Sequence, residues 1–324
     1  MNTESNPHLT DLANQLVARV SQSKNVLIGT HLNPDGDAIG SALAVSQWLD
    51  NLGIANEVIC NNLPPGYLQF LPGCAKVRLQ PERAGHDMGI IVDLDSLERL
   101  GSCRPYFEAL PFLALIDHHI PHEKPGDLRI VEKHAPATAS ILADIIPDID
   151  PAMALCLLTG LVTDTGGFRF PNTSARSLHQ AAELVEKGAN LSLVMSECFL
   201  NRDEPAIHLL GRVLANMKIS CGGRLAGAVL QPGWFIELGA LEEHTEGIVN
   251  EILSIRTVQA AFVLRQGKFG KVKGSLRSKG DIDMAKIAQG IGGGGHKNAA
   301  GVTIEASLEE AERIVERAIA EVLE

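Results

Sequence analysis

A histidine and two aspartates, His31, Asp35 and Asp37, lie within the seven-residue segment HLNPDGD. An apolar run over 25–30 precedes the segment and predicts a buried strand, and an amphipathic stretch over 38–52 follows it and predicts a helix. Proteins that alternate strands and helices place their functional sites at such turns, at the carboxyl ends of the strands. Imidazole and carboxylate groups at this spacing suggest a metal site.

Three further apolar runs end on residues of the same kind. They end on Asp93 (residues 89–93), on Asp117-His118-His119 (113–119) and on Asp164 (158–164). Continuous apolar runs of this length are typical of buried parallel strands, so we expect four strands to bring these side chains to one edge of a sheet. A single Asp after a strand is more often a helix N-cap, but a cap does not require two histidines.

The elements that must position these residues alternate along the first part of the chain. This alternation predicts a parallel sheet with helices on both faces in an α/β domain at 1–190, then a helical linker at 191–204 and a smaller α+β domain at 205–324. We expect the active site in the cleft between the two domains. In the first domain we expect strands at 25–30, 56–60, 89–93, 112–116 and 128–131, and helices at 9–22, 38–52, 137–146, 151–163 and 174–187; the fourth apolar run thus overlaps an expected helix.

Composition limits the class of protein. The 324 residues suggest about two domains, and no apolar run approaches the roughly 20 residues that span a membrane. The N-terminus shows no basic and apolar signal sequence, and the six cysteines form no Cys-x-x-Cys pair. We therefore expect a cytoplasmic protein without a membrane partner, either a monomer or a homodimer. Two Trp and two Tyr provide few stacking platforms for long nucleic acid.

The net charge of −11 would repel an anionic substrate, but the distribution of charge matters more than its sum. Six basic residues and no acidic one lie between Arg265 and Lys279. This stripe would attract an anion, although a solvated strand face would carry the same residues. Bound divalent cations would also reverse the field of the carboxylate cluster.

Residues 290–301 (GIGGGGHKNAAG) form the most distinctive segment of the second domain. The match to G-x-G-x-x-G is weak evidence for a dinucleotide site, because the segment follows a predicted helix rather than a strand. Successive glycines let backbone N–H groups of a turn approach an anion closely. A flexible hinge is the alternative, but it does not account for His296 or for Arg277 upstream. We expect these residues to hold a phosphate or a nucleotide.

Asp117-His118-His119, with the acidic segments before it and Asp164 after it, resembles the DHH phosphoesterase superfamily. The glycine segment, with 275–278, resembles the DHH-associated domain that accompanies it. The order and spacing are similar to the bacterial nanoRNase and pAp-phosphatase branch, as are residues 245–250 and the nearby Arg256. The resemblance covers about 20 to 304.

The resemblance implies two Mn²⁺ ions, and the chemistry of the donors leaves Mg²⁺ or Zn²⁺ as alternatives. The resemblance assigns one ion to His31, Asp35 and Asp93, and the other to Asp37, Asp93, His118 and Asp164, so that Asp93 bridges. The chemistry of the donors agrees, because carboxylates with imidazoles suit Mn²⁺ and two ions can activate a water for attack on phosphorus. The resemblance further implies that His119 contacts the substrate phosphate and that Asp117 orients the site. We expect substrate contacts from Arg256, Ser275, Arg277, Gly293, Gly294, Gly295 and His296.

The function that we favour is hydrolysis of very short RNA to mononucleotides, of pAp to AMP, or of both. A linear or cyclic dinucleotide, pyrophosphate or polyphosphate is the alternative substrate, because the metal site is shared and only the second domain discriminates. A non-catalytic nucleotide-binding protein is the alternative of another class. It would be favoured if ligands were missing, but every ligand position of the pattern is filled. We therefore expect a phosphoesterase whose partner is a short RNA or nucleotide.

Overall fold

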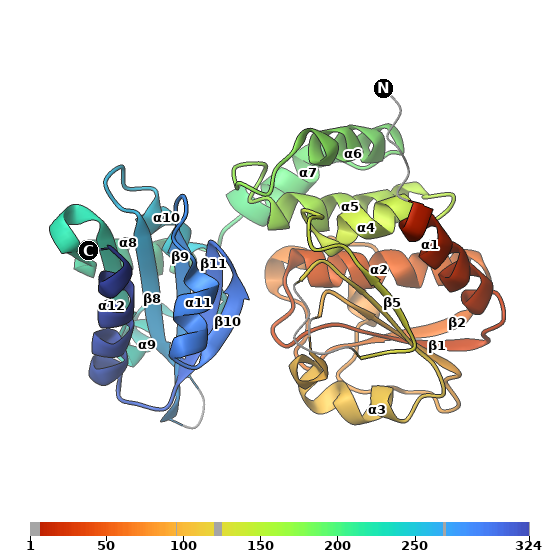
Figure 1. Ribbon diagram of the computed structural model, residues 1–324, viewed down its shortest axis with the longest axis horizontal. Coiled ribbons are helices and arrows are strands. Elements are labelled where there is room, and N and C mark those ends of the chain that lie inside the picture. The colour runs from red at the N-terminus through yellow and green to blue at the C-terminus, as the bar shows by residue number, and fades with distance from the viewer. Residues whose placement is uncertain (1–6, 95, 120–124, 268–269, 324) are drawn as a thin grey trace. The chain divides into compact units, whose positions relative to one another are not determined.

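The computed structural model describes residues 7–94, 96–119, 125–267 and 270–323, and the chain divides into two compact units between Asn201 and Arg202 (Figure 1). The helical linker predicted at 191–204 is not a separate segment between the two units. Helix α7 (Leu191–Met195) and the π-helical turn Ser196–Leu200 belong to the first unit, because Val194 is buried in its core and Phe199 packs against that core. The placement of the active site in a cleft between the units stays a prediction.

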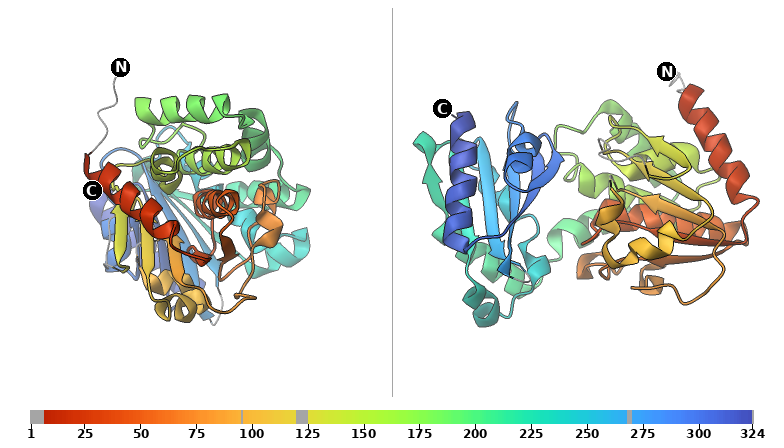
Figure 2. Two further views of the ribbon diagram at one scale, coloured as in Figure 1. Left: turned by 90° about the vertical axis from the view of Figure 1, so that its right-hand side faces the viewer. Right: turned by 60° about the horizontal axis from the view of Figure 1, so that its bottom comes forward.

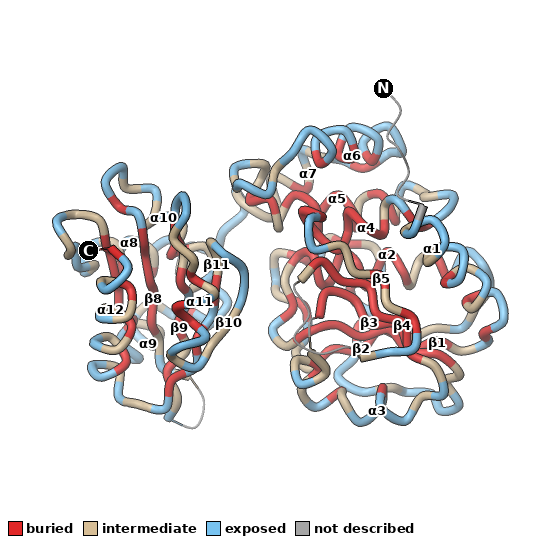
Figure 3. The backbone as a smooth tube through the Cα atoms, viewed as in Figure 1, coloured by how far each residue is buried: buried red, intermediate tan, exposed pale blue. Residues whose placement is uncertain are grey.

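The first unit is built on a parallel five-stranded sheet of order β2-β1-β3-β4-β5. Its central strands are almost wholly buried, as Figure 3 shows, which agrees with their continuous apolar sequences. The three strands that precede the predicted site residues, β1, β3 and β4, are neighbours. The strands are β1 (Asn25–Gly29), β2 (Ala55–Ile59), β3 (Met88–Val92), β4 (Leu113–Asp117) and β5 (Leu128–Val131).

Helices cover both faces of this sheet, as predicted (Figures 1 and 2). One face packs against a thick helical layer, with α6 lying outside α5. The other face carries a thin layer that includes α3 and a 3₁₀ segment at Leu97–Cys103. The helices are α1 (Pro7–Val20), α2 (Gly36–Asn51), α3 (Arg104–Glu108), α4 (Thr138–Ile145), α5 (Pro151–Asp164) and α6 (Ala175–Glu186).

Helices α2 and α5 cross very closely, and two glycines make this possible. A Cβ atom on Gly40 would lie 2.4 Å from the carbonyl oxygen of Cys156, and one on Gly160 would lie 2.6 Å from Oδ1 of Asp37. Glycine is the residue that tolerates such an approach. The crossing places the first turn of α2, with Asp37, against the last turns of α5, which carry Asp164.

The second unit is a mixed six-stranded sheet of order β10-β11-β9-β8-β7-β6 in which only β7 and β8 pair in parallel. Helices α11 and α12 pack on one face, and α8, α9 and α10 contribute to the core on the other. The predicted smaller α+β fold is thus confirmed. Its elements are α8 (Glu204–Asn216), β6 (Lys218–Ser220), β7 (Leu225–Leu230), α9 (Pro232–Leu238), α10 (Ile248–Leu253), β8 (Ala260–Gln266), β9 (Val272–Ser278), α11 (Met284–Gly290), β10 (Gly293–His296), β11 (Ala299–Ile304) and α12 (Leu308–Leu323).

The expectation of a fourth strand at 158–164 is wrong. Asp164 is the last residue of helix α5, which begins with Pro151 after the N-cap Asp150. Because this helix is buried nearly all round, its sequence is a continuous apolar run that periodicity cannot distinguish from a buried strand. None of the described helices is both long and apolar enough to cross a membrane.

Candidate metal centre

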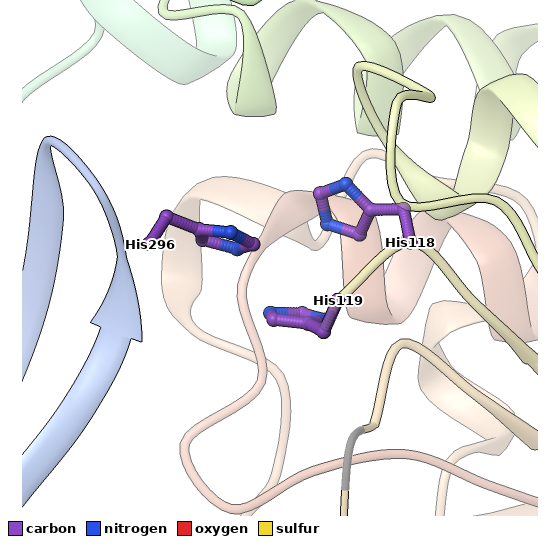
Figure 4. Close-up of side chains that lie close together, drawn as sticks. All are labelled: His118, His119 and His296. Atoms are coloured by element: carbon purple, nitrogen blue, oxygen red, sulfur yellow. The ribbon is translucent and has the colours of Figure 1, made fainter. Parts of the chain in front are cut away.

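Three neighbouring strands deliver the histidines and the central aspartates to one sheet edge. His31 follows β1, Asp93 follows β3, and Asp117 ends β4 with His118 and His119 directly after it. Figure 4 shows the two adjacent imidazoles, whose ring centroids lie 4.6 Å apart in an edge-on arrangement. The carboxyl ends of parallel strands thus place these side chains together, as the sequence predicts.

Asp93 lies at the centre of the cluster, and its two oxygens face different histidines. Oδ2 lies 3.2 Å from Nε2 of His31, whereas Oδ1 lies 3.5 Å from Nε2 of His118. The Nδ1 atom of His119 is 3.6 Å from Oδ1. Asp93 is buried and has a left-handed backbone with φ +58°, a conformation that is uncommon for residues other than glycine and is concentrated at functional sites.

Asp35 and Asp37 are positioned by the start of helix α2. Asp35 is the N-cap, and its Oδ1 accepts the backbone N–H groups of Asp37 and Ala38. Its carboxylate also lies 3.9 Å from Nε2 of His31. Asp37 is buried, and its Oδ2 lies 4.0 Å from Nε2 of His118. The two aspartates therefore approach different histidines.

Asp164 completes the group from the end of α5. Its Oδ2 lies 3.5 Å from Nε2 of His118. Directly after it the chain reverses through three successive left-handed residues, Gly166, Gly167 and Phe168. The Thr165 hydroxyl accepts the backbone N–H of Phe168 and donates to the carbonyl of Leu161, which fixes this reversal to the helix end.

Backbone carbonyls set the orientation of two imidazoles. Nδ1 of His31 donates to the carbonyl of Leu32 at 2.8 Å, and Nδ1 of His118 donates to the carbonyl of Ala135 at 3.2 Å. With Nδ1 as the donor, Nε2 of each ring faces the carboxylates and is the atom that would bind a cation. Histidines that bind metals are held in this way in most proteins.

Burial and mutual proximity shift the acidity of the cluster. Burial raises the pKa of Asp37 well above its ordinary value, and the nearby charges of Asp93 and Asp164 add to this. Burial would also raise the pKa of Asp93, but the hydrogen bond with His31 and the charges of three histidines together lower it well below its ordinary value. Burial lowers the pKa of His119, yet its hydrogen bond to Asp117 and the nearby carboxylate charges raise that pKa to about 9 overall.

These residues fit divalent cations. Within the described part of the chain, the ion-pair partners of Asp37 and Asp93 are all histidines. Because the described residues place no lysine or arginine against these two buried carboxylates, a bound cation is favoured, and oxygen and imidazole donors suit Mn²⁺, Mg²⁺ or Zn²⁺. Three ligand sets within the first unit lie close enough to share an ion: His31, Asp35 and Asp93; Asp37, Asp93 and His118; and Asp93, Asp117 and His119.

The predicted glycine turn of the second unit is wrong in its conformation. Residues Gly293–His296 form strand β10, which pairs antiparallel with β11, so they are not a turn whose successive amides surround an anion. The end of the segment, residues 299–301, lies in strand β11 (Ala299–Ile304). The glycines serve close strand pairing, because a Cβ on Gly293 would lie 2.0 Å from the carbonyl oxygen of Gly301.

Strand pairing nevertheless aligns most of the predicted substrate residues on one face. Arg277 pairs with Ala299, which pairs with His296, and Ser275 pairs with Gly301, which pairs with Gly294. Directly paired residues share a face of a sheet, so these two rows lie side by side. Ser275 and His296 are exposed and Arg277 is half-buried, whereas the alternate residues of β9 are buried. Arg256 is exposed in the turn between α10 and β8.

The sequence did not indicate two residues that contact the metal cluster. Thr138 starts helix α4, and its hydroxyl donates to Oδ1 of Asp93 at 3.0 Å. Asn172 donates from Nδ2 to the carbonyl oxygens of Pro136 and Asp164. Both contacts join distant parts of the chain. A Thr before a helical run and an Asn in a loop have ordinary local explanations, so no local signal could have found them.

Comparison with known proteins decides the family. The family model "DHH family, N-terminal domain" matches residues 25–161, and "DHHA1 domain" matches 216–324. The bifunctional oligoribonuclease and PAP phosphatase NrnA of Thermus thermophilus is 34% identical over 310 residues, which cover 93% of this chain and 92% of that protein. The chain belongs to the DHH family. The predicted resemblance is confirmed, as is the prediction of an enzyme that hydrolyses phosphate esters.

Two further proteins show how far the likeness extends. NrnA of Bacillus subtilis is 25% identical over 309 residues, which cover 93% of this chain and 96% of that protein. The crystal structure of an exopolyphosphatase-related protein from Bacteroides fragilis superimposes with a TM-score of 0.88 at 28% identity, and 97% of each chain is covered. The likeness in fold therefore extends over nearly the whole of this chain.

Proposed function

We propose that this protein is a Mn²⁺-dependent phosphoesterase that hydrolyses oligoribonucleotides of two to five residues to mononucleotides, pAp to AMP, or both. The observation that carries the proposal is the position of Asp93, whose Oδ2 faces His31 at 3.2 Å and whose Oδ1 faces His118 at 3.5 Å. A carboxylate with a histidine at each oxygen is suited to two cations at once. The relatives named as oligoribonuclease and PAP phosphatase support the substrate class.

We assign one cation to His31, Asp35 and Asp93. We assign the second to Asp37, Asp93, His118 and Asp164, for which the approach of His118 to all three carboxylates is the support. Bound divalent cations supply Lewis acidity, which activates water and neutralises charge on the phosphate. Mg²⁺ is compatible with the carboxylates, but the imidazoles favour Mn²⁺.

His119 is assigned to the substrate phosphate. Its Nδ1 donates to Oδ1 of Asp117 at 2.6 Å, and Asp117 is fully buried. This contact fixes the ring and favours its protonated form, in which Nε2 carries the N–H that we assign to a phosphate oxygen. Asp117 acts through His119 and does not itself contact substrate.

The second unit is assigned to the rest of the nucleotide. The exposed face of β9, β11 and β10 combines the cationic Arg277 with His296, Ser275 and two glycines, and Lys273 lies on the same face of β9. Its small residues leave room for a planar or phosphate group close to the backbone. Arg256 and the backbone of Gly293, Gly294 and Gly295 complete the proposed substrate residues.

The test is hydrolysis of a 5′-labelled RNA dinucleotide in Mn²⁺, with pAp, pyrophosphate, a linear dinucleotide signal and a long RNA measured beside it. We expect release of mononucleotides from the short RNA and weak turnover of the long RNA. Turnover of pyrophosphate alone would overturn the substrate assignment while keeping the metal centre. Asp87→Asn is the control variant, because Asp87 precedes β3 at the opposite end from Asp93 and caps the backbone N–H of Lys24.

Arg277→Ala tests the second unit separately. We expect a higher KM for RNA dinucleotides and an unchanged kcat/KM for bis-p-nitrophenyl phosphate, which lacks a nucleoside. Arg317→Ala on the exposed side of α12 is the charge-matched control. An equal loss on both substrates would place Arg277 at the reacting phosphate instead.

A further inference from the structure

The short segment 135–139, which leads from β5 into the first turn of α4, contacts the metal cluster at several points. The carbonyl of Ala135 accepts from Nδ1 of His118, and the carbonyl of Pro136 accepts from Asn172, which also bonds the carbonyl of Asp164. The backbone N–H groups of Thr138 and Ala139 donate to Asp37 at 2.7 and 2.9 Å. With the bond from the Thr138 hydroxyl to Asp93, four of the six proposed ligands are tied, directly or through one side chain, to five consecutive residues.

The start of helix α4 is capped by a residue of the metal cluster instead of by its own N-cap residue. Its N-cap residue is Ala137, which has no side chain that can accept a hydrogen bond from the first turn. The carboxylate of Asp37 takes that part and accepts both N–H groups at the helix start. The start of α4 is consequently held in register with Asp37, and Thr138 is held with it.

Thr138 contacts two proposed ligands with two different groups. Its N–H donates to Oδ2 of Asp37 at 2.7 Å, and its hydroxyl donates to Oδ1 of Asp93 at 3.0 Å. The residue is fully buried, so the hydroxyl bond is shielded from water. The hydroxyl can be removed by mutation without loss of the N–H, which makes its contribution measurable by itself.

The Asp93 carboxylate needs such a partner, because its orientation decides whether each oxygen reaches its own histidine. A rotation of the carboxylate about its Cβ–Cγ bond would turn Oδ1 away from His118 and Oδ2 away from His31, which lie 3.5 and 3.2 Å away. The hydroxyl of Thr138 holds Oδ1 and so opposes this rotation. Groups that orient metal ligands in this way typically change metal affinity or activity by about 10–100-fold when they are removed.

We propose that Thr138 is a positioning residue that sets the rotation of the Asp93 carboxylate for both cations. The inference rests on the proposed function, since it presupposes that Asp93 binds metal. Its alternative is a structural role for Thr138 as the first residue of α4. The two roles differ in what the hydroxyl does: a structural role affects the stability of the metal-free protein, whereas a positioning role affects metal affinity.

The test measures Mn²⁺ binding from the loss of the free Mn²⁺ signal in electron paramagnetic resonance, together with the melting temperature of the metal-free protein. Thr138→Val keeps the shape and the N–H but removes the hydroxyl, and Thr138→Ser keeps the hydroxyl. Thr159→Val is the matched control, because Thr159 is equally buried in α5 and its hydroxyl donates only to the carbonyl of Leu155 among the described contacts.

We expect Thr138→Val to weaken Mn²⁺ binding by at least about tenfold and to lower kcat, with a metal-free melting temperature like that of the control. Thr138→Ser should restore the affinity. If the Val variant does not fold, the pair Thr138→Ser and Thr138→Ala isolates the hydroxyl, since both lack the methyl group. Mn²⁺ affinity equal in the Ser and Ala variants would overturn the inference, and a wild-type protein that binds no Mn²⁺ would overturn the proposed function itself.

Discussion

Nδ1 of His119 donates a 2.6 Å hydrogen bond to Oδ1 of Asp117, the last residue of β4. The acceptor is fully buried, and the ring is mostly buried. This short charged contact distinguishes His119 from the neighbouring His118. Nδ1 of His118 bonds a backbone carbonyl, and its Nε2 faces three carboxylates. Adjacent histidines therefore have different chemical partners and, in the proposed function, different tasks.

Replacing His119 with Gln should lower turnover while the protein still binds metal. The imidazole is assigned to the phosphate, so its loss removes a charge-assisted hydrogen bond, and we expect kcat to fall by about 10²–10³-fold. Bound Mn²⁺, measured by atomic emission after dialysis, should remain as in the wild type. Loss of metal from this variant would show that His119 is a ligand.

The ionisation of His119 can be followed in the metal-free protein. Its pKa is raised from 6.5 to about 9, so the folded state binds this proton more tightly than the unfolded chain does. The resulting stabilisation is fully present below pH 6.5 and is lost as the pH rises through about 9. Imidazole NMR of the EDTA-treated protein should show this titration. It should move to lower pH in Asp117→Asn and stay in place in Asp87→Asn.

Asp93→Asn should abolish hydrolysis and the binding of both cations. Asn tolerates the left-handed backbone that position 93 adopts, so this variant removes the charge without the strain that Ala would introduce. Metal titration by calorimetry is the measurement. Activity above about one tenth of the wild-type value would contradict the bridging role.

Removal of divalent cations should destabilise the first unit. Asp37 and Asp93 are buried beside each other, and Asp164 adds a third charge nearby, so the metal-free fold retains their repulsion. A cation that binds only the folded state at 100 times its Kd adds about 2.7 kcal/mol to the free energy of unfolding. Mn²⁺ should therefore raise the melting temperature of the wild type by several degrees and leave that of Asp93→Asn unchanged.

Two adjacent glycines of β10 should respond differently to substitution. A Cβ on Gly293 would lie 2.0 Å from the carbonyl oxygen of Gly301, so Gly293→Ala should cost about 1–3 kcal/mol of unfolding free energy. A Cβ on Gly294 would meet nothing within 4 Å, so Gly294→Ala should melt like the wild type. If this strand holds the nucleotide, Gly294→Ala should still raise KM. A Gly294→Ala enzyme with wild-type kinetics would remove β10 from the proposed binding surface.

Much of the first unit was predictable because its signals are local. The apolar run before His31 and the runs before Asp93 and Asp117 are buried parallel strands, and their ends meet because β1, β3 and β4 are neighbours. The sequence predicts Asp164 beside the other site residues, where it lies, but it places Asp164 on a strand instead of on helix α5. A helix buried on nearly all sides has no polar stripe, so its sequence carries no helical period.

The contributions of Thr138 and β10 were not predictable for a different reason. Thr138 bonds a carboxylate 45 positions earlier in the chain, and nothing in its neighbourhood marks that partner. In β10, three glycines indicate freedom of the backbone, whereas the close approach of β11 is what requires glycine at Gly293 and Gly295. Both features arise from contacts that form only when distant segments meet.

The parallel sheet of the first unit also has a consequence for how the protein folds. Every strand pairing in it joins segments separated by a crossover, and the proposed ligands extend from His31 to Asp164. Pairings of this kind close long loops and form slowly compared with helices and hairpins. An unfolded or half-folded chain would not bring the ligands of either proposed cation together, so we expect cation binding to follow completion of the sheet. The rate at which Mn²⁺ binding returns during refolding would then report the rate of the last stage of folding.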